Sequence, residues 1–595
     1  MIAYAPPVDD FKFILHEVLR IGEIDDLPSF RELDAGTVDA IIDALGQFAA
    51  EVVAPANEAG DRQGCRLEAD GVVTAAGFAG AYQGFAEGGW ASLTARPEDG
   101  GQGLPHIFLN IRDEMFGGAN LAFAMGPAPA SGFYEILKRH ASDAIRRTYI
   151  PNVVSGRWAV AMSLTEPQCG SALGLIRTRA EPVGDGSHRI TGTKMFNSWG
   201  DHDMAENIVH LVLARLPDAP SGTRGISLFL VPKFLPDASG RPGERNGFSV
   251  GSVEQKMGIH GSPTCVTNFD GATGYLVGAP NQGLPSMFIM MNAVRLATGV
   301  MATGMADATY RHALAYSRER IAGRSPSGAK YPDLPGDPII VHPDVRRMLM
   351  TMRAFSEGAR LLCLWVGLEI ERSKSHEDAQ ARERSDAFVS LLTPVVKSFL
   401  SDKAFEMIDL ALQCFGGHGY IRENGVEQYL RDERMLRLGE GTSGIQAMDL
   451  LGRKVLGDNG EELNRFFGLI RQFADEASVS PRLGAVLPPL RAAVDRMERL
   501  TQEMAPLWRS DPDEVGAASN DYLGMLGHVS LAFMWAKLAH AAGRLLDAGE
   551  ADARLDGKIA TAEFYMARIL PEIFALEARI RAGASTLMRI SDDAF

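Results

Sequence analysis

The sequence predicts a multidomain α+β protein in which a helical region, an all-β region and two further helical regions follow one another. Three observations lead to this prediction. A chain of 595 residues that is 46% hydrophobic exceeds the size at which a single core stops growing. Apolar residues recur every three or four positions toward both ends of the chain, as in helices. Between about 156 and 280 short alternating and β-branched runs replace that spacing, as in strands.

Residues 1–155 are predicted to form an N-terminal helical domain. Segments 38–53 and 107–115 have apolar residues at helical spacing, and loops such as PEDGGQGLP separate the helices. Residues 156–280 are predicted to form a compact middle β domain. Its expected strands are WAVAMSL, SHRITGTKMF, ENIVHLVLAR, GISLFLV and TCVTNF, with Gly, Asp, Pro and Ser turns between them.

Residues 281–460 are predicted to form a C-terminal helix-bundle domain. Long helical periodicity returns over 287–320, 343–372 and 386–414, with lengths suited to a bundle. An additional helical domain is expected over 461–595. The Gly- and Asn-rich GDNGEE and the segment SPRLGAVLPP set it apart.

Composition excludes several classes of protein. A net charge of −16 repels polyphosphate backbones, so no nucleic-acid partner is expected. The five cysteines are widely spaced without a CxxC pair, which argues against a disulfide framework or a zinc site. The N-terminus MIAYAPPVDDFKF lacks the pattern of a signal peptide, and no apolar run reaches membrane-spanning length. We therefore expect a cytoplasmic protein with no metal and no transmembrane segment.

Two segments of the β domain are candidates for contact with a ligand. In LTEPQCGSALG, small residues and hydroxyls allow the backbone to approach a planar or pyrophosphate-bearing group closely. A β-turn with capping hydroxyls explains the same composition. In KMFNSWG an aromatic residue and a serine precede a second Gly turn, although an aromatic residue at a strand end is usually part of a core.

The helix expected to start near 286 carries MMNAVR near its beginning and SRERIAGR at its end. Its arginines could bind phosphate groups, because guanidinium matches them in a bidentate manner. Solvent exposure on a helix face is the alternative for each of them, namely Arg295, Arg318, Arg320 and Arg324.

The segment LQCFGGHGYIRENGVEQYLRDERMLRLGEGTSGIQ contains a lone carboxylate, Glu440, between Gly439 and Gly441. Thr442 and Ser443 are N-cap candidates for the helix that follows. The glycines leave room for a ligand, and burial raises the pKa of a carboxylate toward the range that a general base needs. Glu440 is therefore either a catalytic base or part of a helix start.

Together these segments resemble the acyl-CoA dehydrogenase family over residues 35 to 455, in order and in spacing. The family's flavin-contacting loop corresponds to LTEPQCGS, its aromatic strand to KMFNS, its substrate-binding helix start to MNAVR, its inter-subunit FAD loop to QCFGGHGY and its catalytic segment to GEGTSGIQ. The resemblance implies a helical domain, a middle β-barrel and a C-terminal four-helix bundle, with FAD between barrel and bundle at a subunit interface. The N-terminal YAPPVDDFKFILHEVL and the appended helices resemble a longer bacterial branch that includes the 3-methylmercaptopropionyl-CoA dehydrogenases.

The resemblance implies a role for each matched residue. Glu440 would remove the α-proton of the acyl thioester while the β-hydride passes to flavin N5, which gives a trans-2-enoyl-CoA. The residues implied to bind FAD are Leu164, Thr165, Phe196, Ser198, Arg320, Gln413, Gly417 and Thr442, of which Arg320, Gln413 and Gly417 would reach the FAD of a partner chain. Those implied to bind substrate are Ser171, Asn292, Arg295 and Gly439. The active form is then expected to be a homo-oligomer, with a dimer favoured, and an external acceptor such as electron-transfer flavoprotein would take the electrons.

Three departures from the family pattern concern the site. Phe196 replaces a tryptophan, Asn292 stands where an aspartate is usual, and Gly439 replaces the aromatic residue that often precedes the base. The missing aromatic leaves volume beside the thioester or the acyl tail. We therefore expect Gly439 to widen the acyl pocket.

Two alternatives stay open at this point. An acyl-CoA oxidase shares the base and the flavin but passes electrons to O₂, and the extended C-terminus is compatible with one. A non-dehydrogenating flavoprotein-like binding module, as in DNA-repair-associated relatives, would need a basic C-terminal surface. Residues 461–595 carry 15 Lys/Arg against 20 Asp/Glu, which disfavours the second alternative.

Overall fold

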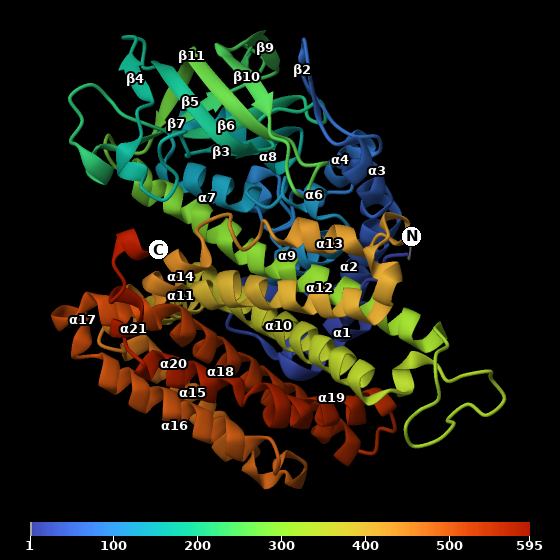
Figure 1. Ribbon diagram of the computed structural model, residues 1–595. Coiled ribbons are helices and arrows are strands. Elements are labelled where there is room, and N and C mark those ends of the chain that lie inside the picture. Colours follow the sequence, from blue (N-terminus) through green and yellow to red (C-terminus); the bar gives the residue numbers. More distant parts are fainter. Residues whose placement is uncertain (1–2) are drawn as a thin grey trace. The chain divides into compact units, whose positions relative to one another are not determined.

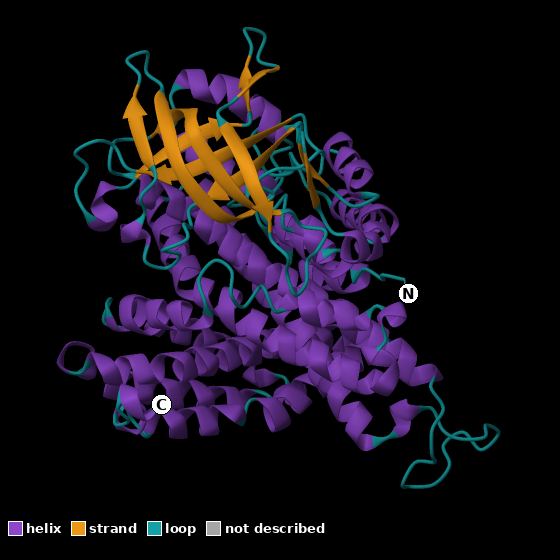
Figure 2. Cartoon of the chain, turned by 45° about the horizontal axis from the view of Figure 1, so that its top comes forward, coloured by secondary structure: helices purple, strands orange, loops and turns teal. Residues whose placement is uncertain are grey.

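The computed structural model describes residues 3–595, which form two compact units. Residues 47–297 form the first, called here the sheet unit. Residues 3–46 and 298–595 form the second, called here the helical unit. The described part of the chain therefore has the predicted order of helices, strands, helices and appended helices, and the strand and helix regions are distinct in Figure 2.

Short helices fill the first half of the sheet unit, and the predicted segments 38–53 and 107–115 are confirmed as helical. Two of these helices start at a side-chain cap. Asn120 accepts a hydrogen bond from the backbone N–H of Phe123 at 3.1 Å, and Ser142 accepts one from Ile145 at 3.4 Å. The helices that open this unit are the end of α2 (Ala35–Phe48), η4 (Ala49–Val53), α3 (Pro55–Gln63), α4 (Phe78–Glu87), α5 (Ile107–Ala119), α6 (Leu121–Ala124), α7 (Ala130–His140) and α8 (Asp143–Val154).

All five predicted strand segments are strands, and they belong to one seven-stranded sheet. The order is β3-β6-β7-β11-β5-β4, with β10 also paired to β11, and only the β3–β6 pair is parallel. The strands are β3 (Trp158–Ser163), β4 (Arg179–Pro182), β5 (His188–Ser198), β6 (Asn207–Ala214), β7 (Ser227–Pro232), β10 (Phe248–Val253) and β11 (Thr264–Val277). Two short ladders, β1 (Arg66–Glu68) with β2 (Gly71–Val73) and β8 (Phe234–Pro236) with β9 (Pro242–Arg245), lie outside it.

The prediction of a β-barrel needs one correction, because the sheet is not closed. Strand β11 curls the sheet by pairing with β5 along its first part and with β7 over its last three residues, with bulges in its register against β5. Among the described residues no ladder joins the terminal strands β3 and β4. Strand β4 is only four residues long, and beyond β5 it meets a single bridge, from Arg179 to Arg215.

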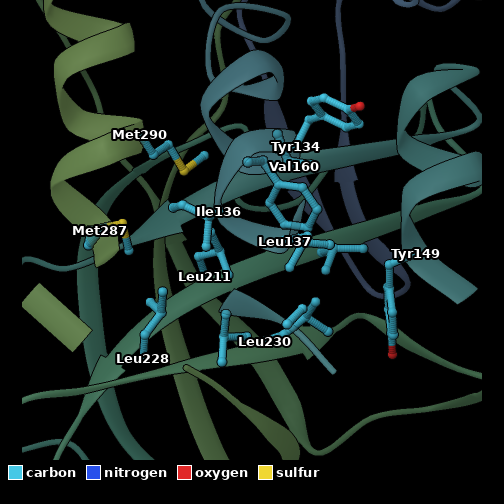
Figure 3. Packing of buried hydrophobic residues seen from close by; sticks show 14 of the residues in the cluster. Tyr134, Ile136, Leu137, Tyr149, Val160, Leu211, Leu228, Leu230, Met287 and Met290 are labelled. Carbon is cyan, nitrogen blue, oxygen red and sulfur yellow. The ribbon is translucent and has the colours of Figure 1, made fainter. Parts of the chain in front are cut away.

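Two apolar cores stabilise the sheet unit. One lies between β3, β6 and β7 and the helices α7 and α8, and Figure 3 shows Leu137, Leu211, Leu230 and Met287 among the side chains that meet there. The other is enclosed by the curl of the sheet and contains Phe229, Phe248 and Phe269. A sheet buried on both faces in this way holds the loops at its strand ends in fixed positions.

Long helices build the helical unit, and the predicted helices 287–320, 343–372 and 386–414 are confirmed. At its centre the long helix α18 packs against α10, α16, α19 and α20 (Figure 1). The indole of Trp535 on α18 donates to the carbonyl of Ala354 on α10 at 2.7 Å. The main helices are α9 (Gly283–Glu319, which starts in the sheet unit), α10 (Pro343–Ser375), α11 (Ala379–Pro394), α12 (Leu400–Phe415), α13 (Val426–Glu433), α14 (Ser443–Met448), α15 (Glu461–Glu476), α16 (Leu487–Met504), α18 (Pro512–Asp547), α19 (Ala553–Phe564) and α20 (Glu572–Arg581).

A buried ion-pair network explains why residues 3–46 belong to the helical unit. Asp10, on α1 (Val8–Phe13), accepts hydrogen bonds from Arg360 on α10 and from Lys558 on α19. Arg360 is fully buried and also pairs with Asp307 on α9 at 3.0 Å, while Lys558 pairs with Glu357 at 2.8 Å. One N-terminal carboxylate thus joins three helices that are far apart in the sequence.

Helix α9 is the only helix in residues 3–595 that is long and apolar enough to cross a membrane by length and composition. Since 61% of its most apolar window is buried, it has the character of a core helix. The five cysteines are free thiols. Within the same residues, no group of three or more His, Cys, Asp or Glu side chains could hold a metal ion.

Candidate functional site

In the sheet unit, the predicted flavin loop is fixed to the neighbouring strand. Leu164 and Thr165 follow β3 directly, and both are half-buried. The carbonyl of Thr165 accepts the backbone N–H of Met195 at 2.9 Å. The ammonium of Lys194 donates to the carbonyl of Leu164 at 2.9 Å. The loop therefore lies beside the segment of β5 that carries Phe196 and Ser198.

The carboxylate of Glu166, the next residue, also holds this loop in place. Its carboxylate accepts from Lys194 at 2.9 Å, from the hydroxyl and N–H of Thr178 at 2.6 and 3.0 Å, and from the N–H of Arg177 at 2.7 Å. Burial alone would raise the pKa of Glu166, but the charge of Lys194 and these hydrogen bonds outweigh it and lower the pKa to about 2. The carboxylate is therefore ionised and held by donors at neutral pH, so it serves as an anchor.

Phe196 is held in a conformation that suits a ligand contact. It lies in a β-bulge of β5, opposite the break in register between Cys265 and Thr267, with a φ of +57° that phenylalanine rarely adopts. Phe196 is 58% exposed, whereas Trp199, three residues later, is buried. An exposed aromatic ring on a strained bulge is typical of a residue that stacks on a planar partner.

The predicted substrate residues of the sheet unit form one close pair and one separate position. On α9, Nη1 of Arg295 donates to Oδ1 of Asn292 at 3.1 Å, and its guanidinium lies 5.7 Å from the centre of the Phe288 ring. Arg295 is buried and Asn292 is exposed. Ser171 is exposed in the loop after Glu166. Asparagine at 292 thus orients the arginine without neutralising its charge.

In the helical unit, Glu440 lies in a strained turn just before α14. Its φ is +58° and that of Gly441 is +100°, so two successive residues have left-handed backbone. The side chain of Glu440 is half-buried. A β-carbon at Gly439 would lie 3.2 Å from the sulfur and the methyl carbon of Met435, which are flexible atoms. The backbone aims a carboxylate from a turn that favours glycine, which indicates a functional constraint.

Two polar side chains, Lys397 and Asp402, hold this turn. The ammonium of Lys397 is fully buried and donates to the carbonyl of Gly441 at 2.7 Å. Asp402 accepts from Nε of Arg437 at 2.6 Å and from the hydroxyl of Ser443 at 3.0 Å. Thr442 occupies the N-cap position of α14, yet within residues 3–595 its hydroxyl makes no capping hydrogen bond. Thr442 therefore has the predicted N-cap position without a capping hydrogen bond, so its hydroxyl is available to a ligand.

Arg320, Gln413 and Gly417 lie near one another, at the adjoining ends of two helices. Tyr316 on α9 stacks on Phe415 of α12 with ring centres 4.3 Å apart, and its hydroxyl lies 2.8 Å from Nδ1 of His418. The three predicted residues are exposed, and the adjacent Tyr420 is 85% exposed. An exposed aromatic residue beside a Gly turn is the composition of a contact surface.

Each unit, taken by itself, offers side chains that suit part of a flavin. Phe196 offers a ring face, and the hydroxyls of Thr165 and Ser198 in the sheet unit and Thr442 in the helical unit make no side-chain hydrogen bond within the described part of the chain. A planar heteroaromatic ring with carbonyl oxygens needs a stacking partner and short donors, which Phe196, Thr165 and Ser198 of the sheet unit offer. Arg320, in the helical unit, is an exposed cation of the kind that binds phosphate.

Sequence reasoning missed the residues that hold the two loops. Lys194 and Glu166 stood inside the quoted motifs, but only the structure shows that they pair. A single lysine in the apolar run VVKSFL was the available signal for Lys397. Glu433, at the end of α13, has no hydrogen bond to either carboxyl oxygen among the described residues, and burial raises its pKa well above the ordinary range.

Family comparisons cover nearly the whole chain. Four family models match: the N-terminal domain of acyl-CoA dehydrogenases over residues 37–157, the middle domain over 161–272, the C-terminal domain over 281–456, and an acetyl-CoA dehydrogenase C-terminal-like domain over 466–591. The 3-methylmercaptopropionyl-CoA dehydrogenase of Ruegeria pomeroyi is 38% identical over 99% of this chain and 100% of its own. A broad-specificity linear acyl-CoA dehydrogenase of Mycobacterium tuberculosis is 32% identical over 100% of both chains.

Solved structures show the same fold. ACDH-11 of Caenorhabditis elegans, in complex with C11-CoA, has a TM-score of 0.76 at 20% identity and covers 95% of this chain and 92% of its own. An acyl-CoA dehydrogenase of Bacillus anthracis complexed with FAD has a TM-score of 0.75 at 19% identity, with 96% and 91% covered. Because full-length relatives exceed 30% identity and every domain model matches in order, the chain belongs to the acyl-CoA dehydrogenase family of FAD-dependent oxidoreductases.

Proposed function

We propose that the protein converts a saturated acyl-CoA to a trans-2-enoyl-CoA, with Glu440 as the base that removes the α-proton. The observation that carries the proposal is the left-handed turn at Glu440 and Gly441, held by Lys397 and by Asp402. A helix cap needs no such strain, whereas a base must be held within hydrogen-bond reach of the proton that it removes. The strain of this turn supports the base over the helix start, the two roles that the sequence leaves open for Glu440.

The residues of this chain would divide the chemistry as follows. Bound FAD supplies the acceptor for the β-hydride. Thr165, Phe196, Ser198 and Thr442 would bind and orient it by stacking and short hydrogen bonds. The backbone N–H of Glu440 would donate to the thioester carbonyl, so that the negative charge that develops on the enolate oxygen is stabilised while the carboxylate takes the proton.

Arg295 and Ser171 would bind the CoA portion of the substrate. A buried guanidinium held by Asn292 at 3.1 Å is pre-oriented, which reduces the entropy lost when phosphate binds. The full-length relatives are named for 3-methylmercaptopropionyl-CoA, for butyryl-CoA and for broad-specificity linear acyl-CoAs. We therefore propose a short- to medium-chain acyl-CoA, with 3-methylmercaptopropionyl-CoA among the substrates to test first.

Glu440→Gln tests the base. The amide keeps the size of the side chain but cannot accept the proton, so flavin reduction should slow by about 10²- to 10⁴-fold. FAD content, melting temperature and acyl-CoA binding should stay unchanged, because the loss lies in the transition state. Stopped-flow flavin bleaching under anaerobic conditions measures the rate, and Glu423→Gln, at an exposed carboxylate, is the control. Near-normal reduction in Glu440→Gln would remove it from the chemistry.

The same preparation separates the oxidase alternative. With a panel of acyl-CoAs, a dehydrogenase reduces an acceptor dye or electron-transfer flavoprotein and consumes little oxygen without one. The full-length relatives named above are dehydrogenases, which supports electron-transfer flavoprotein or a similar protein as the acceptor. Oxygen consumption equal to dye reduction would identify an oxidase.

We further propose a cytoplasmic homodimer in which Arg320, Gln413 and Gly417 contact the partner's FAD. Their exposure beside Tyr420 supports an interface, and a shared cofactor would stabilise it by mass action. Sedimentation of the FAD-loaded enzyme should give a dimer or a higher oligomer, and removal of FAD should weaken it. A fully active monomer is incompatible with this arrangement.

A further inference from the structure

A cavity of about 270 Å³ lies in the helical unit, where the helices of two matched family domains meet. Helices α10 and α12 and the π-helical η9 (Val395–Phe399) come from the domain over 281–456. Helices α18 and α19 and the π-helical η15 (Tyr565–Ile569) come from the appended domain over 466–591. None of the residues assigned above to flavin, substrate or base lines this cavity.

One side of the cavity is apolar. Phe399 can approach α18 because residue 527 is glycine, where a β-carbon would lie 2.2 Å from the Phe399 ring. Both π-helical segments contribute to the wall, and such segments are rare and often mark functional sites. The apolar side chains are Phe355, Phe399, Met407, Leu531, Phe564 and Ile569.

The other side carries charge that is only partly compensated. Lys403 lies 3.0 Å from Glu406 and 3.0 Å from Glu572, so its charge is neutralised. A hydrogen bond with His528 and the charge of Lys403 overcome burial and lower the pKa of Glu572 to about 2, so this carboxylate is anionic. Burial lowers the pKa of His528, whose Nε2 lies 3.3 Å from Glu572.

Two exposed arginines, Arg347 and Arg568, also line the cavity. Arg347 pairs with Asp344, which lies outside the lining, at 2.8 Å. Arg568 makes no ion pair or side-chain hydrogen bond with any residue in the range 3–595. Since Asp344 offsets Arg347, and Glu406 and Glu572 share Lys403, Arg568 is the one cation of the lining without a carboxylate partner among residues 3–595, and it lines the same cavity as the apolar wall. An amphipathic monoanion complements this arrangement.

We propose that this cavity binds a free aliphatic carboxylate of short to medium chain, with its tail on the apolar wall and its carboxylate at Arg568. The volume lies near the lower end of small-molecule pockets, about 300–1,000 Å³, so a complete acyl-CoA with its nucleotide does not fit. The ligand would join helices of both domains and stabilise the helical unit. The proposal does not depend on which acyl-CoA the enzyme oxidises.

Calorimetric titration of the FAD-loaded full-length enzyme with sodium octanoate tests the proposal. trans-2-Butenoyl-CoA is present in excess to occupy the proposed active site. Octanoate should bind once per chain, and affinity should rise about fourfold for each methylene from butyrate to octanoate, since a buried methylene contributes about 0.8 kcal/mol. Octanol, with the same tail and no charge, should bind more weakly.

Arg568→Gln should weaken octanoate binding about three- to tenfold, because an exposed guanidinium contributes modestly to a charge-assisted hydrogen bond. Arg589→Gln, at another exposed arginine of the appended domain, is the matched control and should bind as wild type does. Both variants should retain acyl-CoA oxidation. Four results would each overturn the proposal: no octanoate binding, binding abolished by butenoyl-CoA, no dependence on chain length, or equal affinities in the two variants.

Discussion

Replacing Asp10 with asparagine should destabilise the helical unit by about 3 kcal/mol. The change removes the carboxylate that Arg360 and Lys558 share, and both of these cations are almost completely buried. Breaking a buried ion pair by deleting one partner typically costs about 3–5 kcal/mol. The lower end applies here, because Arg360 keeps Asp307 and Lys558 keeps Glu357. An asparagine carbonyl can accept one of the lost hydrogen bonds, but without the charge.

The expected change in melting temperature follows from the size of the unit. It contains about 340 residues, and unfolding entropy near 2.1 cal/mol/K per residue gives about 0.7 kcal/mol per degree. A loss of about 3 kcal/mol therefore lowers the melting temperature by about 4 °C. Calorimetry of the FAD-loaded protein at pH 7 measures it.

The pH dependence gives a second test of the same ion pair. Burial would raise the pKa of Asp10, but Lys558 and Arg360 hold it well below its usual range. A carboxyl group whose pKa falls on folding stabilises the fold above its unfolded pKa, near 3.9 for aspartate, and loses that contribution as the pH falls through the folded pKa. The gap between wild type and Asp10→Asn should be constant from pH 8 to pH 5 and shrink below pH 4.

Asp9→Asn is the matched control. Asp9 precedes Asp10 but is 81% exposed, and its partner Arg554 is 71% exposed, so this pair should contribute little. If Asp10→Asn melts at the same temperature as Asp9→Asn, the buried network does not anchor the N-terminal segment.

Two further predictions concern the site. Lys194→Met should destabilise the sheet unit by about 3 kcal/mol, because it leaves the Glu166 carboxylate buried without its cation. The flavin absorbance per protein should fall as the Leu164 loop loosens. Full FAD content in this variant would contradict the assignment of that loop. Gly439→Tyr should shift the acyl-CoA preference toward shorter chains, because the new ring must displace Met435 and fill the pocket. An unchanged chain-length profile of kcat/KM would show that Gly439 does not border the acyl tail.

The order of helices and strands could be predicted from the sequence, because it follows from the periodicity of the apolar residues. The β-branched runs became strands and the long three-to-four patterns became α9, α10 and α12. It could not show that the sheet stays open, since closure depends on whether the four residues of β4 reach a second partner. It also could not place residues 3–46 with the helical unit, because that grouping depends on pairs such as Asp10 and Lys558, which are 548 positions apart.

Residues of the candidate site could be predicted from the sequence where their motif lies in one short segment. Glu440 between two glycines is visible in the sequence, although its positive φ is not. The groups that hold the turn come from elsewhere: Lys397 lies 44 positions before Gly441, and Asp402 lies 41 positions before Ser443. Such contacts depend on tertiary packing, which a single sequence does not encode in any short pattern.

Positive φ angles at Phe196 and Glu440 set a trade-off for this enzyme. Glycine would relieve about 1–2 kcal/mol of backbone strain at either position. A random mutation to glycine or asparagine there therefore favours folding. Selection against it comes from the loss of the ring or of the carboxylate. A lineage that no longer needs dehydrogenation should therefore lose these two side chains early and gain stability as it does so. Among chains of this fold, a glycine at both positions would mark a protein that has kept its architecture and given up its reaction.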